Sequence, residues 1–319
     1  MLTVVKAFLF LLLILLAAWS LIGIFDDSVI AFKFLNFFGQ LVPYFSLALA
    51  ASLFYLLKAS RLKWLAITIC LPSFIVPFLA PSVNLYTGLD TPLSPNAAEQ
   101  NFTFITFSKM SHNLNYAEVA KVIDCTKYDV IQVQEIWDLP ALLAAFPKVA
   151  EHCNYAVHPE KPSLATFSKF PLVAKTVEGK AFVEVNINEV PVAVVNVHAL
   201  KAITRGADSQ IAQAKRMVKL EQTLNMPTIV AGDFNATPFN ESIMLMRKHF
   251  KQAQLDSGMF TRRSTWPGEA RRLGTFGPLL QIDYIFYKGL NSANTFIHES
   301  SYGSDHYPMQ TTFSLSAKG

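Results

Sequence analysis

Three long apolar runs occupy the first eighty residues of the chain. They extend over residues 7–25, 37–57 and 64–80, and none of them contains a charged residue. At a rise of 1.5 Å per residue, a helix over the first run is long enough to cross a hydrocarbon core of about 30 Å. A cleaved signal peptide is the alternative, but its apolar core would be shorter, and two further runs argue against simple secretion. The pattern therefore predicts a membrane anchor at residues 1–80 with about three transmembrane helices.

The charges between these runs predict the orientation of the anchor. The loop after the first run holds Asp26 and Asp27, whereas the short loop between the second and third runs is basic, with Lys58, Arg61 and Lys63. Positive loop residues stay on the cytoplasmic side, and Lys6 before the first run agrees with this placement. We therefore expect a multi-pass protein of the inner (cytoplasmic) membrane. Everything after residue 80 would be extracytoplasmic, and periplasmic if the source is bacterial.

A change of pattern follows the anchor. Residues 81–101 are rich in Pro, Asn, Ser and Thr without a period, which is typical of a tether. Short β-rich runs then alternate with helical stretches, beginning with a strand, an amphipathic helix and a second strand over residues 102–135. Closely spaced strands follow between residues 154 and 197, and further strands are expected at 227–233, 281–287, 293–298 and 308–315. Strands inside with helices outside predict an α/β sandwich over residues 102–316.

Composition and charge narrow the function classes only a little. Hydrophobic residues make up 52% of the chain and charged residues 16%, against roughly 25% charged in a typical soluble domain. The net charge of +4 permits a polyanionic substrate without demanding one. Cys70, Cys125 and Cys153 fit no zinc motif; Cys125 and Cys153 would pair in an oxidising compartment, but the favoured interpretation is two free buried thiols.

Polar residues that end apolar strands are the candidates for chemistry, because such strands deliver charge to the edge of a sheet. Four places have this pattern, namely Glu135 in VIQVQE, Asp233 and Asn235 in TIVAGDFN, Asp283 in QIDYIF, and Asp305 with His306 in GSDH. A histidine, His198, also ends the run VAVVNVH. Alone, an acidic residue after a strand is more often a helix cap or a turn residue.

Together, and in this order, these segments resemble the endonuclease/exonuclease/phosphatase family. The five signatures are VQE, VNVHA, AGDFNATP, IDYIF and GSDHYP, and the resemblance covers roughly residues 101–315. It implies a four-layer α/β sandwich of two packed mixed β-sheets flanked by helices. It also implies an active site where strand ends converge.

The resemblance assigns a role to each signature residue. Glu135 would be the principal ligand of Mg²⁺ or Mn²⁺, with Asp305 as a second acidic contributor. Asp233 would orient or deprotonate the attacking water, and Asn235 would donate a hydrogen bond to a phosphate oxygen. His306, held by Asp283, would act as a general base or as a cationic donor in the transition state. His198 would contact the scissile phosphate or protonate the leaving oxygen.

One position departs from the family pattern. Most relatives carry an asparagine shortly after the first strand that supports the metal shell, and the aligned residue here is Ser108. Ser108 is therefore expected in the metal region with weakened metal binding. It also motivates an alternative, a catalytically silent scaffold, although a scaffold has no stability reason to keep so many ionisable groups together.

The substrate stays open at this point. A phosphate ester is expected, as nucleic acid or as a lipid head group, because relatives act on both. The basic stretch from Arg262 to Arg272 favours nucleic acid slightly, whereas the membrane anchor favours lipid. No protein partner is predicted.

Overall fold

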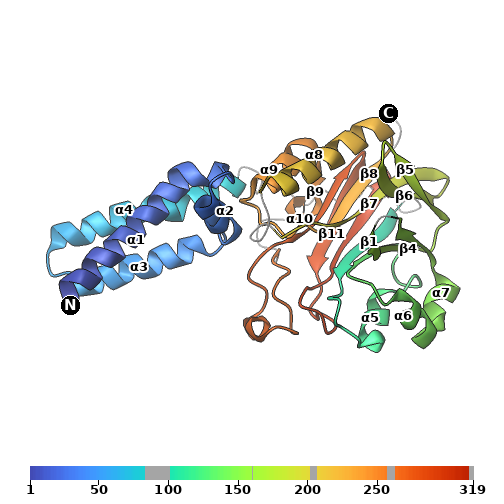
Figure 1. The fold of residues 1–319 in the computed structure, drawn as a ribbon, viewed down its shortest axis with the longest axis horizontal. Coiled ribbons are helices and arrows are strands. Elements are labelled where there is room, and N and C mark those ends of the chain that lie inside the picture. Colours follow the sequence, from blue (N-terminus) through green and yellow to red (C-terminus); the bar gives the residue numbers. More distant parts are fainter. Residues whose placement is uncertain (83–100, 160, 202–206, 257–262, 316–319) are drawn as a thin grey trace.

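The computed structural model describes residues 1–82, 101–159, 161–201, 207–256 and 263–315, so most of the expected tether at 81–101 lies outside the described residues. The apolar N-terminal runs form helices that extend together away from the rest of the chain (Figure 1). They are α1 (Leu2–Ile22), α2 (Ile30–Phe37), α3 (Val42–Leu56) and α4 (Ser60–Ser82), with a short 3₁₀ turn, η1 (Gly23–Phe25), after α1. Helices α1, α3 and α4 contact one another along their lengths and form a bundle.

The expectation of about three transmembrane helices is wrong in number. Among the described residues, α1 is the one helix that is long and apolar enough to cross a membrane, and the bent pair of α2 and α3 raises the count to at most two. The second apolar run does not form one long helix, because α3 begins only at Val42 and has 15 residues. Helix α2, which meets α3 at an angle of 95°, lies almost entirely before the run. Helix α4 begins with Arg61 and Lys63 in its first turn, which lowers its mean hydropathy.

The second part of the chain is an α/β sandwich of two six-stranded mixed sheets. The first sheet has the strand order β11-β12-β1-β2-β4-β3, with β1 (Asn101–Ser108), β2 (Val130–Gln134), β3 (Asn154–His158), β4 (Lys161–Ser168), β11 (Leu290–Ile297) and β12 (Met309–Leu315). The second sheet has the order β5-β6-β7-β8-β10-β9, with β5 (Leu172–Val177), β6 (Lys180–Ile187), β7 (Val190–His198), β8 (Thr228–Asp233), β9 (Lys251–Gln252) and β10 (Asp283–Lys288).

Each sheet has one parallel pair among its central strands. Strands β1 and β2 run parallel, as do β7 and β8, and the other neighbours are antiparallel. The strands β2 and β8 are buried at every position, and most of their residues are apolar, with Gln132 and Gln134 as the polar residues of β2. The mixed sheets and their flanking helices confirm the predicted sandwich.

Hydrophobic clusters fill three spaces between four layers. The central cluster lies between the two sheets and includes Phe104, Val194 and Ile285. The outer face of the second sheet is covered by α8 (Ala207–Leu224) and α9 (Glu241–His249). The outer face of the first sheet is covered by α5 (Tyr116–Val122), α6 (Leu139–Ala145) and α7 (Pro147–His152). A short α10 (Ala253–Asp256) and a 3₁₀ turn, η3 (Arg272–Phe276), lie between β9 and β10.

Cys125 and Cys153 form a disulfide, so the favoured interpretation of two free thiols is wrong. Cys125 lies three residues after the end of α5, and Cys153 directly follows α7. The packing of these helices over the first sheet brings the two Cα atoms to 5.5 Å from each other. The sequence spacing of the two cysteines does not predict this proximity, because the proximity depends on how α5 and α7 pack. Cys70 is buried and free.

Removing the disulfide should destabilise the sandwich. The double variant Cys125→Ala/Cys153→Ala removes a cross-link between residues that are 28 positions apart. The chain entropy that such a cross-link removes from the unfolded state corresponds to a free energy of unfolding of roughly 3 kcal/mol, which the variant should lose. Urea unfolding of the detergent-solubilised chain measures the loss, with Cys70→Ala as the matched control. Equal unfolding midpoints for the wild-type chain and the double variant would contradict the prediction.

Candidate active site

Strand ends from both sheets deliver polar side chains to one end of the sandwich. His198 ends β7 and Asp233 ends β8, and the parallel register places them side by side. Asp283 begins β10 directly opposite Asp233. In the other sheet β2 ends at Gln134, so Glu135 leaves the sheet at the same end. Strand register therefore brings His198, Asp233 and Asp283 together within the second sheet. The packing of the two sheets brings Glu135 to the same end, although it lies 148 positions from Asp283 in the sequence.

Glu135, His198 and Asp233 form a group with the properties of a cation site. Nε2 of His198 lies 3.6 Å from Oε1 of Glu135 and 3.8 Å from Oδ2 of Asp233. One donor atom from each residue lies within 4.8 Å of the others. These separations are longer than hydrogen bonds, so the donors are not consumed by one another. Two carboxylates beside an imidazole suit Mn²⁺, and the carboxylates alone suit Mg²⁺. The residues present therefore fit a divalent cation.

His306 and Asp283 form a second, tighter pair beside this group. Nδ1 of His306 lies 2.8 Å from Oδ2 of Asp283, and Nε2 of His306 lies 3.8 Å from Oδ2 of Asp233. Thr265 donates a hydrogen bond from its hydroxyl to the same Asp283 oxygen. Although Asp233, Asp283 and His306 are also close enough to hold an ion, the hydrogen bond to Asp283 orients the His306 ring with Nε2 toward Asp233.

Burial and charge shift the pKa values of this cluster in opposite directions. Burial raises the pKa of Asp233 to about 8, with the positive charge of His306 opposing the shift and the Asp283 carboxylate adding to it. Burial alone would lower the pKa of His306, but the carboxylates of Asp283 and Asp233 outweigh it and raise that pKa to about 10. Burial lowers the pKa of His198, although the Glu135 carboxylate opposes this. At neutral pH His306 is therefore cationic, and His198 has a free ring nitrogen.

Asp283→Asn should lower the pKa of His306, because it removes the carboxylate that raises that pKa most. If cationic His306 is the active form, activity is lost where His306 deprotonates, so the alkaline limb of the pH–rate profile moves to lower pH. The maximal rate should fall by roughly 10²–10⁴-fold, the usual contribution of a positioned acid or base. Movement of the acidic limb instead would identify neutral His306 as a base. An unchanged profile would contradict the pairing.

Backbone conformations at the site are unusual for their residue types. Glu135 has φ 59° and Asn235 has φ 49°, both in the left-handed region, where non-glycine residues are uncommon and cluster at functional positions. Gly232 has φ 135°, and a Cβ there would meet the Val197 carbonyl oxygen at 2.1 Å. Only glycine therefore allows β7 and β8 to approach where they present His198 and Asp233.

Asn235 lies in the site but differs from its expected role. Its backbone N–H donates to Oδ1 of Asp233 at 2.8 Å. Its side-chain Nδ2 donates to Oδ2 of Asp233 and to the Ala199 carbonyl oxygen, at 2.9 and 3.1 Å. Both amide hydrogens thus have acceptors within the protein, so Asn235 orients Asp233 and has no amide hydrogen left for a phosphate oxygen in this conformation.

Asp305 and Ser108 lie near the cluster without joining it. Oδ2 of Asp305 accepts hydrogen bonds from Arg271, at 2.8 Å from Nε and 2.7 Å in the ion pair with the terminal nitrogen. Ser108 ends β1 beside Gln134. Its buried hydroxyl has no hydrogen-bond partner among the residues that the structure describes, while its carbonyl oxygen accepts from Ser304. Their roles as metal ligands stay predictions.

Two supporting residues, Gln134 and Asn196, were missed by sequence reasoning. Gln134 Nε2 donates to Oδ1 of Asn196 at 2.7 Å across the two sheets. Asn196 Nδ2 donates to the carbonyl oxygens of Val133 and Ala165. The network lies directly beneath Glu135 and His198 and locks the two sheets together there. The signal was present in the sequence, because a glutamine and an asparagine interrupt two otherwise apolar buried strands.

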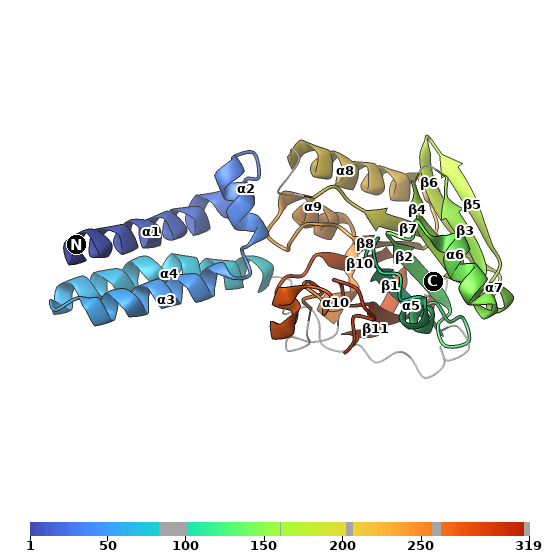
Figure 2. The same ribbon diagram turned by 60° about the horizontal axis from the view of Figure 1, so that its bottom comes forward.

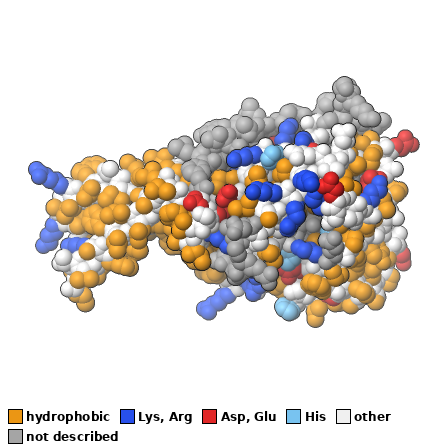
Figure 3. All heavy atoms as spheres, turned by 45° about the horizontal axis from the view of Figure 1, so that its top comes forward, with side chains coloured by type: hydrophobic (Ala, Val, Ile, Leu, Met, Phe, Trp, Pro, Cys, Tyr) orange, Lys and Arg blue, Asp and Glu red, His pale blue; other side chains and the backbone are white. Residues whose placement is uncertain are grey.

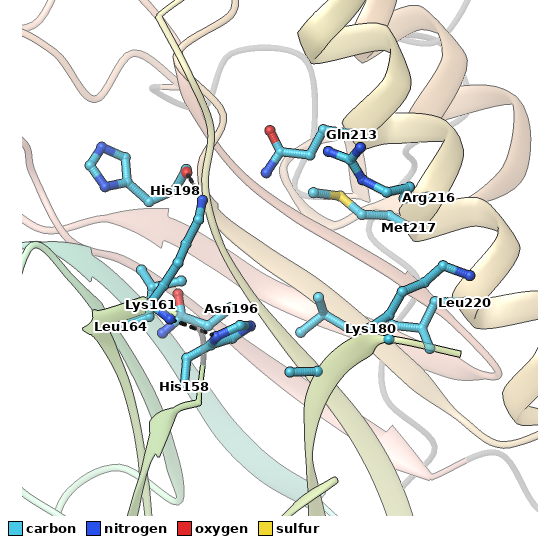
Figure 4. A pocket seen from close by; sticks show the side chains of 13 residues that line it. His158, Lys161, Leu164, Lys180, Asn196, His198, Gln213, Arg216, Met217 and Leu220 are labelled. Carbon is cyan, nitrogen blue, oxygen red and sulfur yellow. Dashed lines mark hydrogen bonds between the residues drawn. The ribbon is translucent and has the colours of Figure 1, made fainter. Parts of the chain in front are cut away.

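A basic cavity of about 180 Å³ opens beside His198. Figure 4 shows the His198 ring turned away from the cavity, while its carbonyl oxygen accepts a hydrogen bond from Lys161 Nζ at 3.1 Å. Lys180 and Arg216 line the cavity from β6 and α8, and no acidic residue is among the described residues that line it. The cavity therefore offers a positive environment next to the candidate cation site.

Comparisons with known proteins agree with this arrangement. Residues 110–306 match the family model described as "Endonuclease/Exonuclease/phosphatase family". No curated protein matches the chain. Similar solved structures include a conserved protein of unknown function from Enterococcus faecalis V583, with 17% identity, a TM-score of 0.53 and coverage of 67% of this chain and 100% of that one.

Two further structures are similar at the same level. TDP2 of D. rerio, complexed with single-strand DNA product, has 14% identity and a TM-score of 0.53, covering 67% of this chain and 99% of that one. The human Nocturnin catalytic domain with a bound sulfate anion has 17% identity and a TM-score of 0.50, and the match covers 68% of this chain and 95% of that one. These likenesses show the fold, and the family match spans more than half of the chain. The chain belongs to the endonuclease/exonuclease/phosphatase family.

Proposed function

We propose that the chain is a metal-dependent hydrolase of phosphate esters. The observation that carries the proposal is the convergence of Glu135, His198, Asp233 and the His306–Asp283 pair at one end of the sandwich. A scaffold would bury this many ionisable groups together only at a cost in stability. A catalytic site needs such groups close together for its chemistry. The arrangement therefore argues against a catalytically silent scaffold.

Glu135, His198 and Asp233 would hold the cation, either Mg²⁺ or Mn²⁺. When bound, a divalent cation neutralises charge on a phosphate oxygen and lowers the pKa of bound water. With the cation bound, its positive charge would lower the raised pKa of Asp233, so that Asp233, oriented by Asn235, would accept a proton from the attacking water. His306, kept cationic by Asp283, donates a hydrogen bond to phosphate oxygen as charge builds. Asp305 and Ser108 would support the cation from the edge of the site, with Asp305 held by Arg271.

The helical bundle would anchor this domain in a membrane. Helix α1 supports the anchor, and hydrophobic side chains cover the visible face of the bundle while lysines and arginines gather at its free end (Figure 3). The α3–α4 turn with Lys58, Arg61 and Lys63 lies at that end near the N-terminus (Figure 1). Basic residues stay cytoplasmic, and a disulfide favours an oxidising compartment. We therefore place the sandwich outside the cytoplasmic membrane.

Hydrolysis by the full-length chain in detergent tests the proposal. Bis(p-nitrophenyl) phosphate and p-nitrophenyl phosphate serve as soluble substrates for a diesterase and a monoesterase. We expect turnover with Mn²⁺ or Mg²⁺ that Asp233→Asn abolishes, whereas Glu151→Gln, an exposed change on α7, leaves it intact. Folded protein that hydrolyses neither ester would overturn the proposed function and support the silent scaffold.

A further inference from the structure

The bundle is attached to the sandwich by buried polar contacts, centred on Asp27. The Asp27 carboxylate is 4% exposed and accepts hydrogen bonds from Asn36 Nδ2 and the Glu241 backbone N–H, both at 2.8 Å. Asn240 Nδ2 lies 3.2 Å from the same carboxylate. Asn240 makes no side-chain cap of its own for α9. Asp27 therefore caps α9 from another part of the chain, where its negative charge favours the helix N-terminus.

Three more contacts fix the same junction. The Thr237 hydroxyl donates to the Asn36 carbonyl oxygen at 2.7 Å. The Gln281 backbone N–H donates to Gln40 Oε1 at 2.8 Å. Gly39 packs so closely on the ring of Phe239 that a Cβ would approach it to 2.6 Å. Several directional bonds between buried groups hold one orientation, so the bundle and the sandwich form a single structural unit.

The junction lies at the catalytic end of the sandwich. Thr237 and Asn240 follow Asp233 and Asn235 in the loop that leaves β8, and Gln281 precedes Asp283 by two residues. Figures 1 and 2 agree in placing the bundle on the side of the sandwich where α9 and the loop before β10 lie. The candidate active site is therefore near the membrane end of the molecule and not at its far end.

Apolar side chains are exposed at this same level on two elements. On α2, Ile30 is 80% exposed and Phe34 is 50% exposed. On the segment between Trp266 and Leu280, Leu273 is 55% exposed and Phe276 is 80% exposed. Phe37 at the end of α2 packs in one cluster with Trp266, Leu280 and Ile282, which flank that segment. Helix α2 and the flanks of the segment are therefore packed together, while the four apolar side chains stay exposed. Helix α2 follows shortly after α1, the candidate membrane helix.

The segment with Leu273 and Phe276, which we call the junction loop (residues 267–279), is also connected to the active site. Arg271 in this loop pairs with Asp305, the neighbour of His306. The Gly268 backbone N–H donates to the Asp305 carbonyl oxygen at 2.7 Å. Arg272 is exposed next to Leu273. A loop with outward apolar and basic side chains matches the chemistry of a bilayer surface with phosphate head groups.

We propose that the junction loop and α2 rest on the membrane surface and hold the active site against it, so that the substrate is the phosphate ester of a lipid head group. The inference rests on the proposed phosphoesterase activity and adds its substrate class. The lipid stays in the bilayer while its head group enters beside the His306–Asp283 pair. A site fixed at the bilayer surface meets its substrate by lateral diffusion, without extraction from the membrane.

The test uses the full-length chain reconstituted into vesicles of phosphatidylethanolamine and phosphatidylglycerol with Mn²⁺, and measures release of phosphorylated head groups. Leu273→Ser with Phe276→Ser should lower this rate by about tenfold, given the apolar area withdrawn from the interface. Because α1 still retains the protein in the vesicle, the lower rate reports on the contact between the junction loop and the membrane surface and not on membrane attachment. The matched control, Val173→Ser, alters a residue that is 49% exposed on the remote strand β5 and should leave the rate unchanged.

Soluble bis(p-nitrophenyl) phosphate separates this inference from the proposed function. The loop variant should hydrolyse it at the wild-type rate, because the soluble ester needs no membrane contact. An equal vesicle rate for loop variant and wild type would overturn the inference. Cleavage of supercoiled plasmid without any lipid hydrolysis would also overturn it, in favour of nucleic acid. Failure of the wild type on the soluble ester would instead refute the proposed function itself.

Discussion

Glu135→Gln is expected to abolish Mn²⁺ binding at the active site and to lower kcat/KM for phosphate ester hydrolysis by about a thousandfold or more, since a catalytic cation supplies several kcal/mol of charge stabilisation. Glu135 combines three properties expected of the principal ligand. It follows a buried strand, its Oε1 faces His198 at 3.6 Å, and its other oxygen, Oε2, is held by the Ser111 backbone N–H at 2.8 Å. Glutamine keeps the shape but removes the charge that attracts the cation.

Isothermal titration with Mn²⁺ and steady-state hydrolysis measure the two effects in the same samples. Glu151→Gln removes an equal charge from the exposed surface of α7 and should change neither. Unaltered metal affinity in the Glu135→Gln protein would remove Glu135 from the ligand set. Lost affinity with retained turnover would show that the cation is not needed for the reaction.

Asp27→Ala is expected to destabilise the chain by roughly 3 kcal/mol, because it strips the donors on Asn36, Asn240 and Glu241 of a buried charged acceptor. It should also lower kcat on a soluble ester by about tenfold at temperatures where the protein is folded, since it loosens the loop that carries Asp233 and Asn235. Urea unfolding and kinetics in detergent provide the measurements. Asp26→Ala is the matched control, because the Asp26 carboxylate bonds the backbone of Ser28 in an exposed turn.

Exchanging the side chains of Asp27 and Asn240 tests whether the hydrogen bond between them, and not Asp27 alone, supports catalysis. Asn240→Asp alone places two carboxylates face to face and should be as damaging as Asp27→Ala. Asp27→Asn combined with Asn240→Asp restores an amide opposite a carboxylate and should recover most of the lost kcat. If the double variant is no better than the sum of the single variants, the junction does not support catalysis through this contact.

The sandwich could be predicted from the sequence because its signals are local. Buried strands such as 228–233 are continuous apolar runs, and the site residues directly end or begin them, so strand register alone brings Asp233 beside His198 and opposite Asp283. The His306–Asp283 hydrogen bond agrees with the role that the family resemblance implied. These parts depend on residues whose surroundings are set by their own strands.

The parts that escaped prediction depend on packing between distant segments. The Cys125–Cys153 disulfide requires the arrangement of α5 and α7 over the first sheet. Asp27 reads as an ordinary loop residue before a helix, yet its partner Asn240 is 213 positions away. The number of membrane spans was overestimated because hydropathy does not reveal that α3 begins only at Val42, after the 95° bend from α2, and is therefore short. No local pattern encodes such contacts.

The most direct test of the central claim is metal-dependent hydrolysis of bis(p-nitrophenyl) phosphate by the full-length chain, first with Mn²⁺, then with excess chelator, and then with Mn²⁺ restored. The proposed site predicts turnover that stops with chelator and returns with the metal, and that Asp233→Asn eliminates under every condition. Turnover that persists in chelator, or that survives Asp233→Asn, would contradict the account.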